Sequence, residues 1–159
     1  MKYTFNTLEE VKQAIEQWFI TLGFDNKERA EKQYLKIISE IGETADSICK
    51  ENRSNTLSEI GDIFVTIIGY NLQKNEYLKL DYYDYDGESL FEPVDYLDDI
   101  LLSILERNFN ESILDLNWLA FTQDSNLLKC ATIAYNKIQG RLERGELSVK
   151  NGTVIKSGK

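Results

Sequence analysis

The sequence repeats a short acidic motif, SEIGE at residues 39–43 and SEIGD at residues 58–62. Each copy holds two carboxylates three residues apart within an apolar, helix-periodic segment, and the pairs are Glu40 with Glu43 and Glu59 with Asp62. Three residues is close to one helical turn, so the members of a pair project from one face of a helix. Two such helices side by side bring four carboxylates into one small volume, where a positive charge must offset their repulsion. The repeat therefore predicts a site for a divalent cation.

A structural interpretation of the same residues is weaker. Acidic residues are common on helix surfaces, and Glu59 could close a capping box with Thr56 as the N-cap residue. That interpretation explains neither Asp62 nor the repeated spacing. It also leaves Gly42 and Gly61 unexplained, because a glycine inside a helix costs about 1 kcal/mol relative to alanine. These glycines predict the close approach of another backbone or of a ligand.

The residue types on offer limit which cation could bind. The chain has no histidine, so only oxygen ligands are available, and these favour Mg²⁺, with Mn²⁺ as an alternative. A di-iron bundle needs Glu-x-x-His motifs and is excluded, as are His-ligated zinc and histidine-based general base catalysis. An EF-hand loop built on the DYDG sequence at 84–87 fails, because its twelfth position would be Pro93.

Length and charge set further bounds. With 159 residues, the chain fits a single domain spanning 1–159. Its net charge of −9 argues against nucleic acid or an anionic membrane as a partner, because both need a basic surface. No signal peptide pattern, long apolar span or CxxC spacing is present, so we expect a cytoplasmic protein without a disulfide framework.

Hydrophobic periodicity predicts an all-α fold. The single proline, Pro93, leaves most of the chain free to form helices. We expect helices at about 8–22, 25–50, 56–73, 94–107, 112–121 and 125–144. The second and third form an antiparallel helical hairpin that can bring the two acidic flanks together within a helical bundle. Residues 75–93 form an acidic, tyrosine-rich insertion, and Asn151-Gly152 between alternating runs predicts a C-terminal β-hairpin.

The E-x-x-E, linker, E-x-x-D arrangement resembles the MazG-like all-α nucleoside triphosphate pyrophosphohydrolases. The likeness covers roughly residues 5–74 and 125–155, and its end is similar to that of short, phage-type members. The resemblance implies Mg²⁺-dependent hydrolysis of (d)NTPs between the α- and β-phosphates, giving a monophosphate and pyrophosphate. It implies that Glu40, Glu43, Glu59 and Asp62 hold the metal and carry the catalysis. It also implies assembly as a homodimer or homotetramer, because sites of the family are usually completed by dimerisation.

Several other side chains are candidates for substrate binding, each with a structural alternative. Lys36 could reach a phosphate or only neutralise Glu40 one turn away. Lys137 and Arg141 are one turn apart and lie beside Asn136. They could clamp phosphate oxygens, or they could only form a solvated basic end of a helix, which the helix dipole favours. The resemblance places an aromatic ring that stacks on the base at Trp18, although its apolar stripe suits core packing.

One departure from the family pattern bears on catalysis. Many relatives have a further glutamate just before the first motif glutamate, and this chain has Ser39 there. Ser39 cannot be a general base, so the proton acceptor would be one of the four carboxylates or a second water. The alternative is a catalytically weak helical protein of the same fold that binds a nucleotide or a partner.

Overall fold

The computed structural model describes residues 2–80, 89, 91–150 and 153–156, and it is all-helical over most of that length. A single 3₁₀ turn, η1 (Lys27–Arg29), precedes the second helix. The α-helices of the described residues are α1 (Leu8–Thr21), α2 (Ala30–Cys49), α3 (Arg53–Lys74), α4 (Pro93–Leu105), α5 (Phe109–Thr122) and α6 (Leu127–Glu143). The predicted all-α fold is confirmed, and the predicted helices all exist with ends shifted by a few residues.

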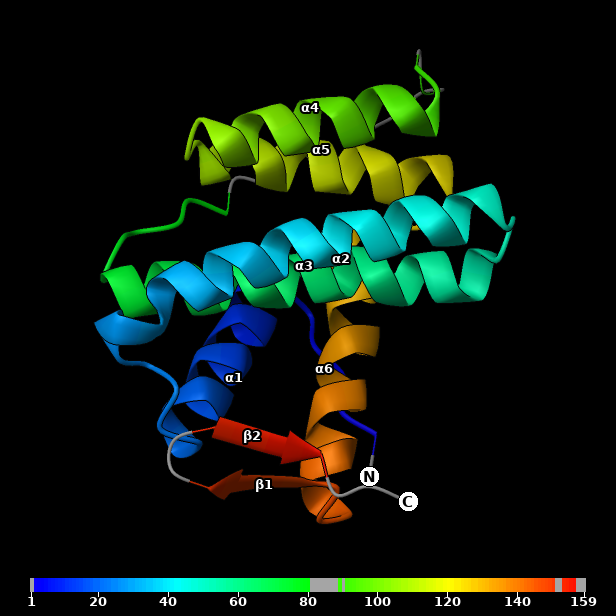
Figure 1. Ribbon diagram of the computed structural model, residues 1–159. Helices are drawn as coiled ribbons and strands as arrows, with labels where there is room; N and C mark the ends of the chain where they lie inside the picture. The colour runs from blue at the N-terminus through cyan, green and yellow to red at the C-terminus, as the bar shows by residue number, and fades with distance from the viewer. Residues whose placement is uncertain (1, 81–88, 90, 151–152, 157–159) are drawn as a thin grey trace.

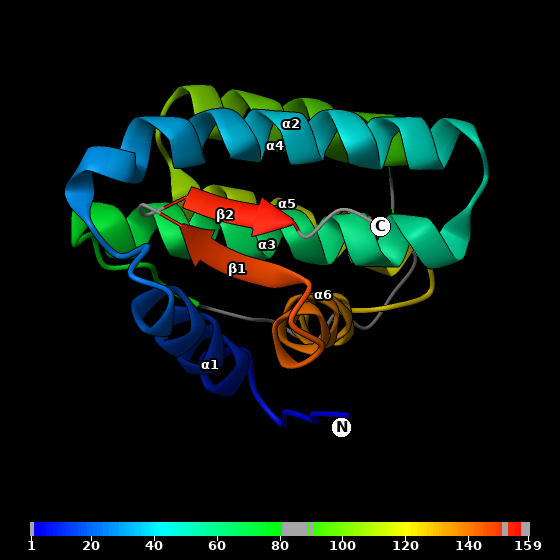
Figure 2. The same ribbon diagram turned by 60° about the horizontal axis from the view of Figure 1, so that its bottom comes forward.

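The helices are stacked in three layers (Figures 1 and 2). The antiparallel pair α2 and α3 forms the middle layer, the pair α4 and α5 covers one side of it, and α1 and α6 lie against the other side. The predicted hairpin of two acidic helices is therefore the centre of the fold, and both of its sides are covered.

Helix α3 is the central element and contacts α1, α2, α5 and α6. These neighbours cover most of its surface, and every residue from Ile60 to Asn71 is buried. Gly61 lies where α6 crosses: a Cβ atom built there would stand 2.1 Å from the carbonyl oxygen of Cys130. The prediction that another backbone approaches closely is thus confirmed for Gly61. At Gly42 no described atom lies within 4 Å of a Cβ built there, so no other described part of the chain approaches it, and the approach of a ligand stays a prediction.

Helix α3 begins one turn earlier than the sequence indicated. The cap is Asn52, whose side chain accepts a hydrogen bond from the backbone of Asn55, so Thr56 lies inside the helix. The Thr56 hydroxyl instead contacts the Ser47 hydroxyl at 3.0 Å and joins α3 to α2. The capping-box interpretation of Glu59 is therefore wrong, since Glu59 stands in the second turn and not at N3.

Arg107 joins the layer of α4 and α5 to the central hairpin through a cation–π contact and a hydrogen bond. The guanidinium of Arg107, just after α4, lies 3.4 Å from the ring centroid of Tyr34 on α2. The same group donates a hydrogen bond of 2.8 Å to the hydroxyl of Tyr70 on α3. Each of these contacts is worth about 0.5–2 kcal/mol when partly buried.

After α6, the C-terminal part of the chain forms two short strands, β1 (Leu147–Lys150) and β2 (Thr153–Lys156), which pair antiparallel. The predicted Asn151-Gly152 turn lies outside the described residues, so the hairpin as such stays a prediction. Residues 81–88 and 90 of the predicted insertion also lie outside them. Both cysteines, Cys49 and Cys130, are free, and no described helix is long and apolar enough to cross a membrane.

Candidate metal and nucleotide site

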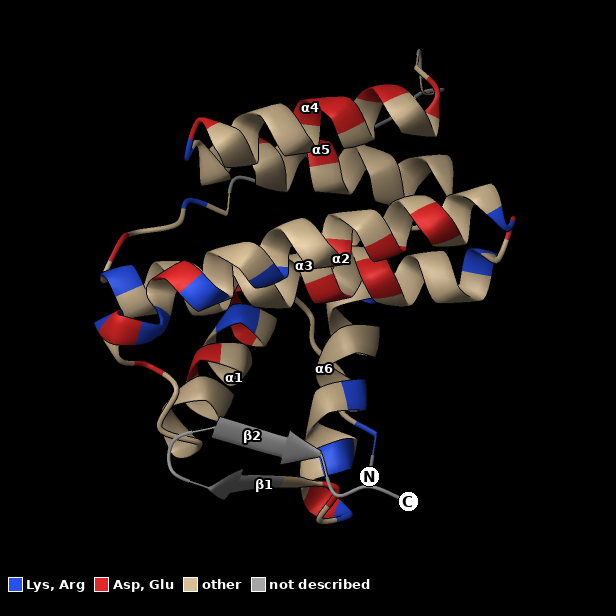
Figure 3. Ribbon diagram, viewed as in Figure 1, with Lys and Arg blue, Asp and Glu red and all other residues tan. Residues whose placement is uncertain are grey.

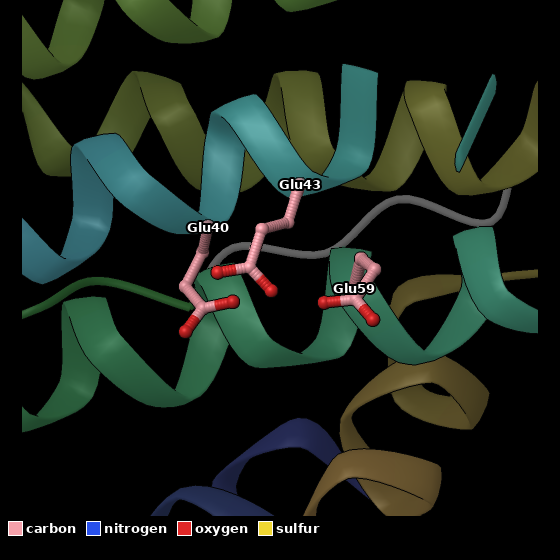
Figure 4. Close-up of side chains that lie close together, drawn as sticks. All are labelled: Glu40, Glu43 and Glu59. Carbon is pink, nitrogen blue, oxygen red and sulfur yellow. The ribbon is translucent and has the colours of Figure 1, made fainter. Parts of the chain in front are cut away.

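The hairpin brings three of the four predicted carboxylates to one place. Glu40 and Glu43 point from α2 and Glu59 points from α3, and one oxygen of each lies within 4.8 Å of the others (Figure 4). Two oxygens bound to the same Mg²⁺ at about 2.1 Å are at most about 4.2 Å apart. The Glu43 side chain is 55% exposed, so it has room to rotate toward that separation.

The fourth carboxylate, Asp62, is close by but is held by a lysine. Its Oδ2 atom contacts the ammonium group of Lys137 from α6. The same ammonium donates a hydrogen bond of 3.2 Å to the Ser58 hydroxyl and lies 4.0 Å from Glu59 Oε1. The sequence paired Lys137 with Arg141 as a phosphate clamp, and the structure adds that Lys137 also neutralises the second acidic motif.

Lys36 makes the corresponding contact with the first motif. Its Nζ atom is 2.5 Å from Glu40 Oε1 and 3.6 Å from Glu43 Oε1. Burial opposes the positive charge of Lys36, yet its hydrogen bond to Glu40 and the charges of both glutamates outweigh this and raise its pKa. Of the two roles considered for Lys36, neutralisation of Glu40 is the one that these contacts show, and phosphate binding stays a prediction.

Burial makes two of the carboxylates costly to ionise. Desolvation raises the pKa of Glu40, although Lys36 lowers it in part and Asp62 and Glu43 add repulsion. Desolvation likewise raises the pKa of Glu59 against the opposing charge of Lys137. Glu59 is only 7% exposed, and its Oε2 atom has no hydrogen-bond partner among the described residues. A buried carboxylate oxygen without a partner is unfavourable, and a cation bound by the cluster would supply that partner.

Glu40, Glu43 and Asp62 form an acidic wall in a pocket of about 660 Å³ that is lined by residues of α1, α2, α3 and α6. Glu59 belongs to the carboxylate cluster but does not line this pocket. Basic side chains surround the acidic wall, and Figure 3 shows basic positions on α6 beneath the acidic stretch of the hairpin. The lining cations are Arg29, Lys32, Lys36, Lys137 and Arg141. An acidic wall opposite a basic rim suits a ligand that carries phosphates together with a divalent cation.

The other end of the pocket is aromatic. Trp18, Phe19 and Phe24 line it, and the Trp18 ring packs edge-on against Phe19 with centroids 5.3 Å apart. Trp18 packs against the core and also lines the pocket, so the core-packing role is seen, and stacking on a base stays a prediction. Its indole Nε1 and the Gln73 Oε1 atom, in the same lining, are buried without hydrogen-bond partners among the described residues.

Asn136 is the one predicted substrate-binding residue that does not line the pocket. Its side-chain oxygen accepts a hydrogen bond of 2.7 Å from the backbone N–H of Tyr3, and its amide donates to the carbonyls of Tyr3 and Thr132. The amide group is thus engaged in fixing the N-terminal segment along α6. The neighbouring lysine and Arg141 do line the pocket.

Sequence reasoning missed other lining residues, chiefly Arg29, Lys32 and Gln73. Lys32 had a usable signal, because it precedes Lys36 by one turn on the flank of α2 that carries the acidic motif. Arg29 and Gln73 had none. Arg29 lies in a 3₁₀ turn with its guanidinium 4.3 Å from the ring centroid of Phe24, and Gln73 reaches the pocket only because α3 packs against the loop containing that phenylalanine.

Comparison of the chain with protein-family models, curated proteins and solved structures finds no match. The function must therefore be argued from the geometry of the site.

Proposed function

We propose that this chain is a Mg²⁺-dependent nucleoside triphosphate pyrophosphohydrolase, as its resemblance to the MazG-like family implies. The observation that carries the proposal is the convergence of three carboxylates, Glu40, Glu43 and Glu59, beside a pocket lined by basic and aromatic side chains. The buried Glu59 Oε2, which has no hydrogen-bond partner among the described residues, supports it further, because a cation bound by the cluster would satisfy this oxygen.

The residues present fit a hard divalent cation. Every donor in the cluster is a carboxylate oxygen, which is the ligand type that Mg²⁺ and Mn²⁺ prefer. Glu40, Glu43 and Glu59 would hold the cation, and Asp62 would join them once its lysine moves. When bound, the cation would neutralise phosphate charge and make the attacking water more acidic.

The other side chains of the pocket have separate tasks in the proposed reaction. Arg141 and the neighbouring lysine on α6 hold phosphate oxygens through charge-assisted hydrogen bonds. Trp18 offers an apolar ring to the base at the far end of the pocket. Ser39 cannot accept a proton, and its hydroxyl donates to Glu43 at 3.3 Å. The proton of the attacking water would therefore pass to one of the four carboxylates or to a second water.

Pyrophosphate detection with a panel of ribo- and deoxyribonucleoside triphosphates tests the proposal directly. We expect Mg²⁺-dependent release of pyrophosphate and a nucleoside monophosphate from the wild-type chain. Glu43→Gln and Asp62→Asn should each abolish it, because each removes an anionic ligand while keeping the size of the side chain. Glu31→Gln is the matched control, since this exposed glutamate lies on α2 in the first turn, outside the pocket.

The alternative, a nucleotide-binding protein of the same fold that does not catalyse hydrolysis, gives a different result. A nucleotide that binds only the folded state raises the melting temperature even when no product forms. Stabilisation by nucleotide without pyrophosphate would therefore replace the enzyme with the binding protein. Near-normal turnover in both carboxylate variants at subsaturating Mg²⁺ would show that the reaction takes place elsewhere.

A further inference from the structure

Two lysines already neutralise the carboxylates that the cation is proposed to use. Lys36 reaches both glutamates of the first motif, at 2.5 and 3.6 Å. Lys137 contacts Asp62 of the second motif and lies 4.0 Å from Glu59. One ammonium group thus serves each acidic pair, and the two come from different helices, α2 and α6. This arrangement keeps four neighbouring carboxylates tolerable when no metal is bound.

The ammonium groups and a bound cation compete for the same oxygens. A Mg²⁺ ion binds carboxylate oxygens at about 2.0–2.1 Å. An ammonium nitrogen that stays within 2.5–4.0 Å of those oxygens would be only a few ångströms from the ion. Like charges at that separation repel strongly in a partly buried site. Binding of the cation therefore requires both lysines to leave.

The pocket provides a destination for them. Both lysines line it, and the Lys36 side chain is 51% exposed, so its flexible stem can turn toward the cavity. The rim they face also carries Arg29, Lys32 and Arg141, so an anion in the pocket is already surrounded by positive charge. A triphosphate placed there would offer the released ammonium groups new oxygens.

We propose that Lys36 and Lys137 are exchangeable counter-ions: a divalent cation displaces them from the carboxylates, and they then bind the triphosphate. This inference rests on the proposed function, because it takes the acidic cluster as the metal site. It predicts that the cation and the triphosphate assist each other's binding. The cation alone removes the carboxylate partners of the two lysines, whereas the triphosphate supplies phosphate oxygens as new partners.

The experiment measures binding, not activity, in the full chain and in Lys36→Met and Lys137→Met. Mn²⁺ affinity is read from the electron paramagnetic resonance signal of free Mn²⁺ without nucleotide. Affinity for inorganic tripolyphosphate is read by calorimetry in saturating Mn²⁺. Lys27→Met, in the 3₁₀ turn before α2, and Lys129→Met, on α6, are the matched controls. Each removes one positive charge from an exposed lysine that does not line the pocket and has no ion-pair partner among the described residues.

We expect each test variant to bind Mn²⁺ about tenfold more tightly than its control. A tenfold difference corresponds to a lysine ammonium group that occupies the carboxylates about 90% of the time. The same variants should bind tripolyphosphate at least fivefold more weakly, whereas the controls change little in both measurements. A methionine keeps most of the lysine stem, and melting curves show that each variant folds. Lys36→Met is the safer of the two, because Lys36 is the more exposed lysine.

The opposite signs of the two effects are what a purely structural role cannot produce. Mn²⁺ affinities equal to those of the controls would overturn the inference, and so would unchanged affinity for tripolyphosphate. Absence of Mn²⁺ binding in every protein would overturn it together with the proposed metal site. If the paired effects occur but no nucleotide releases pyrophosphate, the counter-ion exchange stands and the proposed hydrolysis fails.

Discussion

The two motif glycines occupy equivalent places in the sequence but opposite environments, so the same substitution should have opposite effects. At Gly61, an alanine Cβ would lie 2.1 Å from the Cys130 carbonyl oxygen and 2.8 Å from the Ala134 Cβ. Both atoms belong to α6, and a carbonyl oxygen cannot rotate away as a flexible side chain can. Helix α6 must therefore move by about 1.3 Å or more to reach an ordinary contact distance. At Gly42, no described atom lies within 4 Å of the added methyl group.

The free energies follow from these distances. Alanine gains about 1 kcal/mol over glycine in a helix interior, and this is the whole effect expected for Gly42→Ala. For Gly61→Ala, overpacking against a backbone costs about 3 kcal/mol or more. The net loss of stability is then about 2 kcal/mol. In a chain of this size 1 kcal/mol shifts the melting temperature by about 2–4 °C. Gly42→Ala should melt about 3 °C higher than the wild type and Gly61→Ala about 6 °C lower.

Urea denaturation followed by circular dichroism measures both variants, and thermal melting gives an independent value. The reasoning fails if Gly61→Ala is as stable as the wild type, because the close crossing of α3 and α6 would then not exist. It fails in part if Gly42→Ala is destabilised, because another surface would then have to contact α2 there. Because α6 carries Lys137, the shifted helix in Gly61→Ala should also weaken tripolyphosphate binding.

Three further predictions concern charge. Burial, with repulsion from Asp99 and Glu111, raises the pKa of Asp115 from 3.8 to about 6. The folded state therefore binds more protons than the unfolded state between those pH values, and the free energy of unfolding falls as the pH rises through 4–6. Asp115→Asn should be about 1–2 kcal/mol more stable than the wild type at pH 7.5 and equally stable near pH 3.5. Urea melts at a series of pH values measure this difference, and a difference that does not change with pH would refute the prediction. Arg141→Ala should lower kcat/KM for nucleoside triphosphates at least tenfold, since a charge-assisted contact is worth about 1.5–3 kcal/mol, and unchanged kinetics would make this arginine only the basic end of α6. Mg²⁺ or Mn²⁺ should support turnover, whereas Ca²⁺ should bind without supporting turnover well, because Ca²⁺ accepts longer bonds and looser geometry. Full activity in the presence of excess chelator would exclude the metal mechanism.

The sequence alone determined much of this protein. Helix-periodic apolar residues and a single proline predicted the all-α fold and each of its helices. The prediction works because a helix that buries one face repeats its apolar residues with the period of the helix. The repeated three-residue spacing predicted that the acidic pairs meet across a hairpin, because spacing within a helix fixes the face that a side chain shares. The pairs also stand on neighbouring helices joined by a short turn, so little was left for the tertiary structure to decide about their meeting.

Tertiary structure decided what lies around those carboxylates. Lys137 is 75 residues from Asp62, and Arg29 and Gln73, which are 44 residues apart in the sequence, join the same pocket. No local pattern encodes such distances, which depend on the angles at which α1 and α6 cross the central pair. The same crossing separates two glycines that look alike in sequence, since α6 touches one and nothing in the described chain touches the other. It also directs Asn136 to the backbone of Tyr3 and its neighbour Lys137 to the acidic cluster, because adjacent residues on a helix point about 100° apart.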